Sequence, residues 1–269
     1  MGKRAPSKGG RVEQTGYYEL QNLESRLLLS GSVTAVIDGS GNLTITGTTT
    51  AAVNITITSD GANAWEITGK KTLINGSKSN IATGVTGNIS INLNSGNDHL
   101  TVKDGDILGD LYIATGDGAD TTSLSNLQIA NYLNFNANEG NDSLCINNVH
   151  VLDPTDEYYS TITAQDGNNT DKVNDFTDQD LEVTLGDGNN SFDMNDSTFL
   201  DGTSARLMIT AGNGNDQITL DSVSTSPLTI ALGNGRNHLN IDSSLADTFA
   251  LTEGTGHNKI SITDSVLDG

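Results

Sequence analysis

Residues 207–218 read Leu-Met-Ile-Thr-Ala-Gly-Asn-Gly-Asn-Asp-Gln-Ile: an alternating apolar run, a glycine-rich turn, and a return to apolar residues. The same turn recurs along most of the chain, and its second glycine serves as the anchor of each repeat. The eight anchors are Gly96, Gly118, Gly140, Asn169 (in place of Gly), Gly188, Gly214, Gly235 and Gly256. The steps between them are 22, 22, 29, 19, 26, 21 and 21 residues. A repeat of about 22 residues indicates a solenoid.

The residues on both sides of each anchor alternate between apolar and polar. Positions five and seven before the anchor are apolar in every repeat, as at Ile209 and Leu207. The fourth position after it is apolar in seven of eight repeats, as at Ile218, with Thr122 the exception. Apolar residues two apart are typical of a strand with one buried face. A strand therefore enters each turn and another leaves it.

A third, weaker element follows the second strand, as in 221–223 (Asp-Ser-Val), and predicts a second corner with a short third side. Stacked repeats would lie about 4.8 Å apart, so eight of them would make a rod roughly 40 Å long. Thirty Gly, three Pro and 4% aromatic residues fit many tight corners around a narrow aliphatic core. We predict an all-β fold: a right-handed parallel β-helix or β-solenoid of about eight rungs.

The pattern divides the chain into three segments. Residues 1–30 are a basic leader, residues 31–85 a β-rich cap with two strand–turn–strand units, and residues 86–269 the repeats. Trp65, the only Trp, is expected to close the apolar end of the rod. Such a cap prevents end-to-end association of exposed strand edges.

The charge of the chain is strongly negative but unevenly placed. The formal net charge is −21, although the first 30 residues carry five of the 13 basic residues. An acidic surface repels nucleic acid and anionic lipid and attracts cations. No apolar stretch approaches the ~20 residues of a membrane helix, so no transmembrane segment is predicted. The single Cys145 excludes an internal disulfide.

Residues 23–31 read Leu-Glu-Ser-Arg-Leu-Leu-Leu-Ser-Gly and follow a basic N-terminus. This segment resembles the LEPR-XLL segment at the start of large secreted or surface proteins of planctomycete bacteria. It departs from that pattern at Ser25, where Pro is usual. The resemblance implies export or surface attachment, and therefore an extracellular or cell-surface location.

The turn at residues 212–218 follows the G-x-G-x-D-x-U core of the RTX nonapeptide and resembles it. RTX repeats bind calcium through Asp carboxylates and turn carbonyls. They recur every nine residues, whereas this motif occurs once per rung, so a cation would lie between successive rungs. The resemblance implies these ligands for Ca²⁺: Asp98, Asp120, Asp142, Asp171 and Asp216.

Two explanations of this aspartate column stay open. Carboxylates about 4.8 Å apart repel one another by roughly 1 kcal/mol in water, and a bridging cation relieves that repulsion. Alternatively, Asp and Asn occur there because they tolerate left-handed turns and bond to local backbone donors. Asn190, Asn237 and Asn258 in later rungs favour the second explanation there.

No catalytic constellation recurs on the predicted outer faces, so a non-enzymatic structural or adhesion-type β-solenoid is the leading hypothesis. Its partners would be a surface polysaccharide, or a second copy at the last rung, residues 260–269. The alternative is a carbohydrate-binding or carbohydrate-active β-helix that uses loop 150–159. That loop contains His150, Asp153, Pro154, Asp156, Glu157, Tyr158 and Tyr159.

Overall fold

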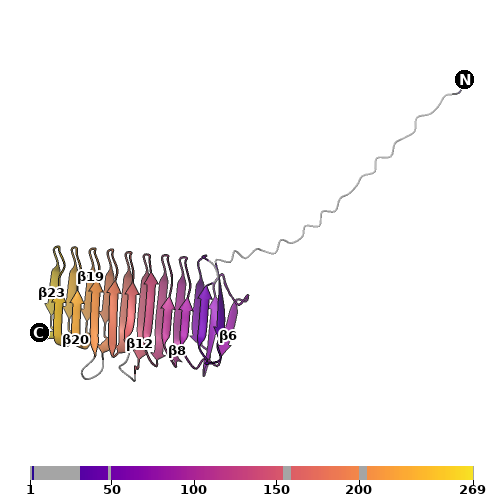
Figure 1. Cartoon of the computed structure of the whole chain (residues 1–269), viewed down its shortest axis with the longest axis horizontal. Helices are drawn as coiled ribbons and strands as arrows, with labels where there is room; N and C mark the ends of the chain where they lie inside the picture. Colours follow the sequence, from indigo (N-terminus) through magenta and orange to yellow (C-terminus); the bar gives the residue numbers. More distant parts are fainter. Residues whose placement is uncertain (1, 3–30, 48–49, 154–158, 200–204, 269) are drawn as a thin grey trace.

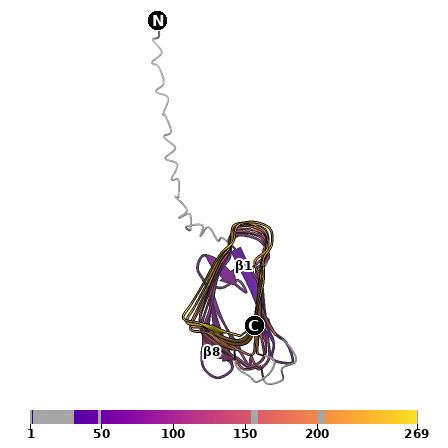
Figure 2. The same cartoon turned by 90° about the vertical axis from the view of Figure 1, so that its left-hand side faces the viewer.

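The computed structural model describes residues 2, 31–47, 50–153, 159–199 and 205–268. Within these ranges the chain forms 24 strands and no helix, and all strands belong to one hydrogen-bonded sheet. Figure 1 shows the strands stacked along one long axis, and Figure 2 shows that successive rungs superpose when viewed along it. The predicted parallel β-solenoid of about eight turns is confirmed. No helix that could span a membrane occurs in the described residues.

Two long sides of each rung meet at the glycine-rich turn. The strands that enter the turn are β7 (Ile89–Asn92), β9 (Leu111–Ala114), β11 (Leu133–Asn138), β13 (Ser160–Ala164), β15 (Asp180–Leu185), β18 (Arg206–Ala211), β20 (Ser224–Ala231) and β22 (Leu245–Thr252). The strands that leave it are β8 (His99–Ile107), β10 (Thr121–Ile129), β12 (Ser143–Val151), β14 (Thr170–Asp178), β16 (Ser191–Asn195), β19 (Gln217–Asp221), β21 (His238–Asp242) and β23 (Lys259–Thr263). Each strand pairs in parallel with the equivalent strand of the next rung.

The second corner of each rung is made by one residue in the left-handed conformation. Its φ angle lies between 45° and 59° in every rung, at Asp104, Asn126, Asn148, Asp175, Asp196, Ser222, Ser243 and Asp264. Asp and Asn adopt this conformation more readily than other non-glycine residues. The chain then continues along a short third side, which includes β17 (Thr198–Phe199) and β24 (Val266–Leu267). This matches the predicted second corner.

The core consists of columns of inward-facing side chains, one per rung. In one column Leu124, Ile146 and Val173 lie in register on successive rungs, and each is buried. Burying one such side chain contributes about 1.5–3 kcal/mol relative to leaving it exposed. Because each side chain is covered by the rungs above and below, stability depends on stacking.

The N-terminal end of the rod is covered by six strands: β1 (Gly31–Ile37), β2 (Leu43–Gly47), β3 (Asn54–Ser59), β4 (Ala64–Gly69), β5 (Thr72–Ile74) and β6 (Ser79–Thr83). The pairs β1–β2, β3–β4 and β4–β6 are antiparallel, whereas β5 pairs with β1 in parallel. Hairpin β3–β4 joins the rod because β3 pairs in parallel with β8. Trp65 on β4 is 2% exposed and lies beside Gly105, where a Cβ atom would come 2.7 Å from Cη2 of Trp65. Apart from Gly2 and the first residue of the cap, Gly31, the leader and LEPR-XLL-like segment lie outside the described residues.

The fourth anchor predicted from the sequence is wrong. Gly167, with φ 147°, stacks between Gly140 and Gly188, so it takes the anchor position that was assigned to Asn169. Asp171 then occupies the inward position four residues after the anchor, in register with Leu144 and Phe192. An anchor at Asn169 instead places the apolar Val173 four residues after the anchor, which shifts the repeat by two residues.

The last described rung leaves part of the core uncovered. Ile260 and Ile262 on β23 continue the columns of Leu239 and Ile241, and they are 36% and 44% exposed. Val266 on β24 is 59% exposed.

Candidate functional site

The turn edge carries a continuous hydrogen-bonded column of Asp and Asn side chains two residues after the anchors. Each Oδ1 atom accepts the backbone N–H of the equivalent residue in the preceding rung, over 2.7 Å from Asp98 to Asp120 and 2.8 Å from Asp120 to Asp142. The column continues through Asn169, Asn190, Asp216, Asn237 and Asn258. At its start, Oδ1 of Asp98 accepts the N–H of Val53 from the cap. These side chains tie every rung to the next.

The asparagines in this column also use their amide nitrogen. Nδ2 of Asn169 donates to the Gln165 carbonyl at 3.0 Å, and Nδ2 of Asn190 donates to the Gly186 carbonyl at 2.9 Å. Asn237 does the same with the Leu232 carbonyl at 2.7 Å. Both ends of each Asn side chain therefore have partners in the turn.

The aspartates of the column are left with one unmatched oxygen each. The Oδ2 atoms of Asp98, Asp120, Asp142 and Asp216 are buried and have no hydrogen-bond partner. Thr115, beside Asp120, donates its hydroxyl to the Ala137 carbonyl instead. In the Asn rungs the equivalent atom, Nδ2, contacts a carbonyl oxygen of its own turn. An ionised carboxylate in this position lacks a donor, and this costs free energy.

Burial raises the pKa of these aspartates. The pKa of Asp98 rises to about 6, against the opposing hydrogen bond from the Val53 N–H. The pKa of Asp142 also rises to about 6 because of burial, with the charge of Asp120 adding to the rise. The same cause raises the pKa of Asp120 and of Asp216. The column therefore holds protons more tightly than ordinary aspartates.

Asp171 does not belong to this column, contrary to the prediction. It is 2% exposed among core residues, and its Oδ2 has no hydrogen-bond partner. Burial raises its pKa to about 7, and the charge of Asp142 adds to the rise. Of the five predicted calcium ligands, the structure thus aligns Asp98, Asp120, Asp142 and Asp216 on one edge and places Asp171 inside the rod.

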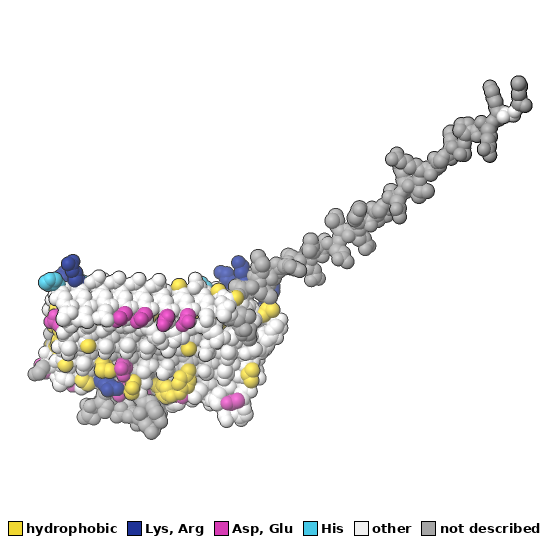
Figure 3. All heavy atoms as spheres, turned by 45° about the horizontal axis from the view of Figure 1, so that its top comes forward, with side chains coloured by type: hydrophobic (Ala, Val, Ile, Leu, Met, Phe, Trp, Pro, Cys, Tyr) yellow, Lys and Arg dark blue, Asp and Glu magenta, His cyan; other side chains and the backbone are white. Residues whose placement is uncertain are grey.

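A second acidic column, not recognised from the sequence, lies on the outside of the same turns, one residue before the anchors. It consists of Asp117, Glu139, Asp166 and Asp187. Their backbone carbonyls accept the anchor N–H groups of the preceding rungs, for example Gly118 N to Glu139 O at 2.9 Å. All four are exposed, and Figure 3 shows a row of acidic side chains along this edge. In the described residues, no group of three or more His, Cys, Asp or Glu side chains is arranged to hold a metal ion.

The loop predicted as an alternative site adjoins a cavity of about 280 Å³. His150 and Thr177, on neighbouring rungs, line the cavity and are joined by a 3.1 Å contact between Nδ1 and Oγ1. Asp178 also lines it, and burial raises its pKa to about 8 despite hydrogen bonds from Ser160 and Gln179. Pro154, Asp156, Glu157 and Tyr158 lie outside the described residues.

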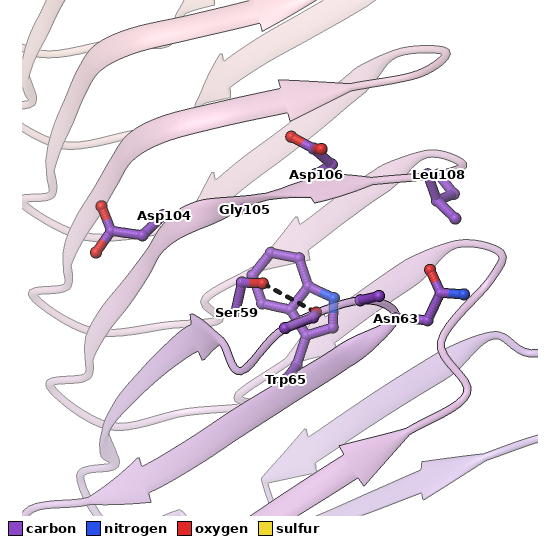
Figure 4. A pocket seen from close by; sticks show the side chains of 9 residues that line it. Ser59, Asn63, Trp65, Asp104, Gly105, Asp106 and Leu108 are labelled. Carbon is purple, nitrogen blue, oxygen red and sulfur yellow. Dashed lines mark hydrogen bonds between the residues drawn. The ribbon is translucent and has the colours of Figure 1, made fainter.

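A larger cavity, of about 520 Å³, lies between the cap and the first rung (Figure 4). Trp65 forms part of its wall, and the Ser59 hydroxyl donates to the Gly61 carbonyl at 3.4 Å. Because Trp65 is 2% exposed and packs against Gly105, its ring presents almost no surface to a ligand. This cavity is therefore a gap in the packing where the cap meets the rod.

The fold places the chain in the structural class of parallel β-solenoids. No protein-family model matches it, and searches of curated proteins and of solved structures also gave no match.

Proposed function

We propose that this chain is a non-enzymatic structural or adhesion-type rod that works outside the cell or on its surface. The observation that carries the proposal is the Asp/Asn column, in which side chains link each rung to the next from Val53 to Asn258. Because these bonds run along the rod axis and are buried, they resist bending and separation of rungs. The acidic outer turns, with a net charge of −21 for the chain, keep such rods apart in solution.

The location is tested by expressing the full chain and a variant without residues 1–30 in a planctomycete host. Biotinylation of intact cells and fractionation would locate both proteins. We expect the full chain to be labelled at the surface or secreted and the shortened chain to stay inside. Equal retention of both inside the cell would contradict the proposal.

Stabilisation of the rod by calcium stays a prediction. Four column aspartates offer an unmatched buried oxygen each, which favours a cation. Calcium takes six to eight oxygen ligands, however, and the column offers one unmatched oxygen per rung, so the donor set fits only in part. A thermal melt in millimolar calcium against chelator tests it: a higher melting temperature in calcium supports binding, and an unchanged one contradicts it.

Carbohydrate binding or turnover near loop 150–159 is the second candidate function. The cavity beside His150 and the raised pKa of the buried Asp178 carboxyl favour it, because a carboxylic acid that keeps its proton more tightly can donate a proton or a hydrogen bond. Release of reducing sugar from a polysaccharide panel tests turnover. Loss of any such activity in an Asp178→Asn variant would support this role, and activity unchanged by the substitution would contradict it.

Self-association through the last rung also stays a prediction. Ile260 and Ile262 present exposed apolar side chains on a strand that pairs, among the described residues, only with β21. Analytical ultracentrifugation of the full chain and of an Ile262→Lys variant tests it. A dimer that the substitution dissociates supports the contact, and a monomeric parent chain contradicts it.

A further inference from the structure

In the described residues, outward-facing aromatic side chains are confined to one small part of the rod. Trp65 and four of the five Phe residues are buried, and Phe249 packs partly buried against the core. Three tyrosines are the only outward-facing aromatic residues in the part of the chain that the structure describes: Tyr112, Tyr132 and Tyr159. With 4% aromatic residues in the whole chain, such a concentration marks this surface as different from the rest.

These tyrosines lie in two adjacent columns on consecutive rungs. Tyr132 and Tyr159 directly precede Leu133 and Ser160, which face one another across the rungs through a 3.0 Å bond from Leu133 N–H to Ser160 Oγ. By the same register the column begins at Asp110 and continues through Asp180 to Arg206. Together with Tyr112 we name this surface the tyrosine strip: Asp110, Tyr112, Tyr132, Tyr159, Asp180 and Arg206. Its five rungs span about 19 Å.

In the part of the tyrosine strip nearer the N-terminal cap, the side chains of Tyr112 and Tyr132 are held rigidly. The rings of Tyr112 and Tyr132 meet edge to face, with centroids 5.5 Å apart and planes at 89°. Their hydroxyl groups are hydrogen-bonded to one another, and the Tyr112 hydroxyl donates to Oδ2 of Asp110 at 3.1 Å. Fixed rings lose little conformational entropy when a ligand binds.

In the part of the tyrosine strip farther from the cap, the side chains of Tyr159 and Arg206 are also ordered. The guanidinium carbon of Arg206 lies 5.0 Å from the centroid of the Tyr159 ring, a cation–π contact. Asp180 orients Arg206 by accepting its backbone N–H at 2.9 Å, and its carboxylate lies 4.0 Å from Nε. Tyr159 nevertheless stays 45% exposed. The strip therefore offers an accessible aromatic surface at Tyr159, flanked by the carboxylate of Asp180 and the guanidinium of Arg206.

We propose that the tyrosine strip binds a neutral polysaccharide laid along the rod axis. Aromatic faces pack against the C–H faces of pyranose rings, while carboxylate and guanidinium groups accept and donate hydrogen bonds to sugar hydroxyls. Sites of this kind combine aromatic surface with a few fixed polar groups. The cavity beside His150 borders the strip through Gln179, next to Asp180, and extends the polar surface available to a polymer.

The charge of the protein selects among polysaccharides. A net charge of −21 repels uronic-acid and sulfated polymers, whereas a neutral polymer experiences no such repulsion. Tyr and Arg are also enriched at protein–protein contacts. A peptide or protein partner would require a broader apolar surface, and only Leu152, 51% exposed, lines the adjoining cavity as a large exposed apolar residue. The narrow, axial shape favours a linear polymer.

Binding is tested on the purified full chain with cellulose, chitin, xylan and mannan, by pull-down and by affinity electrophoresis. Hexasaccharides of the bound polymer then give a Kd by calorimetry. Tyr159→Ala should weaken binding about tenfold or more, as for truncation of an aromatic side chain that the bound ligand covers. Tyr159→Phe keeps the ring and should stay within about threefold of the parent chain. Lys172→Ala, at an exposed position of strand β14 on another side of the rod, is the matched control and should leave Kd unchanged.

Thermal melts establish that each variant is folded, and the Tyr159→Phe variant keeps the test valid if Tyr159→Ala loses structure. The proposal is overturned if no neutral polymer binds, or if Tyr159→Ala and Lys172→Ala have equal effects. Preferential binding of polygalacturonate would also overturn it. The proposal rests on the second candidate function, carbohydrate binding near loop 150–159, and names its surface and ligand class. Failure of polymer binding leaves the export and stiffness of the rod untouched, and it is distinguished from failure of sugar turnover, which is read by reducing-sugar release and Asp178→Asn.

Discussion

The backbone N–H of Asp120 donates a 2.8 Å hydrogen bond to Oδ1 of Asp142 in the next rung. The rest of the column repeats this contact, with Asp and Asn as interchangeable acceptors. The two residue types differ only in the second side-chain atom, which has a partner in the Asn rungs and none in the Asp rungs. The rod therefore contains its own comparison between an amide and a carboxylate at one buried position.

Asp142→Asn should stabilise the rod at pH 8. The new Nδ2 would donate to a carbonyl of its own turn, as in Asn169, and a buried charge would be removed. One recovered buried hydrogen bond is worth about 1 kcal/mol in the free energy of unfolding. Chemical denaturation measures the change, and Asn190→Asp is the matched reverse variant, expected to destabilise. A loss of stability in Asp142→Asn would refute this account of the column.

Stability should fall as the pH rises from about 4 to 8. Burial raises the folded-state pKa of Asp98 and Asp142 to about 6, of Asp171 to about 7 and of Asp178 to about 8, from 3.8. The folded rod thus binds more protons than the unfolded chain in this window. The contribution of these four aspartates to the free energy of unfolding is therefore fully present below pH 3.8, and it is lost as the pH rises through their folded-state pKa values. Melting temperatures across pH 4.5 to 8.5 measure the trend.

The groups that face Asp178 in this titration are Ser160, Gln179, Asp153 and Asp180. His99 and Asp117 act on Asp120, and Asp187 acts on Asp216. In an Asp178→Asn variant, the melting temperature should depend less on pH near pH 8 than it does in the parent chain. A melting temperature of the parent chain that rises between pH 5 and 8 would show that the buried acids are ionised at little cost.

Asp171→Leu should stabilise the rod. Asp171 lies in register between Leu144 and Phe192, and the same column contains Leu100 and Ile218 in other rungs. Leucine would continue this apolar column and remove a buried carboxyl group that lacks a partner for Oδ2. The expected gain at pH 8 is about 2 kcal/mol in the free energy of unfolding, from burial of the side chain. Denaturant titration measures it, with Lys172→Leu on the exposed neighbouring position as the control.

The alternating strands and the glycine-rich turns could be predicted because each follows from a local pattern of side chains. The fourth anchor could not, since Asp171 stands at a position where every other rung except Thr122 has an apolar residue. With the fourth anchor placed at Asn169, other columns of side chains were also out of alignment. With Gly167 as the anchor, Asp110, Tyr132, Tyr159, Asp180 and Arg206 all stand eight residues before their anchors. The correct repeat alone would have aligned them.

The hydrogen bonding of the turn column needed the structure. The sequence left two explanations of the aspartate column open: calcium ligands, or residues that tolerate left-handed turns and bond to local backbone donors. The left-handed residues of the rungs include the anchor glycines, Asn94 and Asn138 in the turns, and corner residues such as Asn126, whereas Asp120 bonds across rungs. Between rungs, the partner of each Oδ1 is 21 to 27 residues away, and Asp98 bonds to Val53 over 45 residues, so the contact depends on the register between rungs.

Gly118→Ala should be among the most destabilising single substitutions in the chain. Gly118 has a φ angle of 152°, and a Cβ atom there would lie 1.7 Å from the carbonyl oxygen of Gly96 in the adjacent rung. Since that oxygen belongs to a backbone held in the stack, the two rungs would have to separate at the turn. The expected loss is at least about 2 kcal/mol in the free energy of unfolding, because strained backbone and a displaced turn act together. Gly39→Ala is the matched control, since nothing lies within 4 Å of its Cβ position. Thermal melts of both variants decide the matter: equal melting temperatures would mean that the turns are not as closely stacked as described.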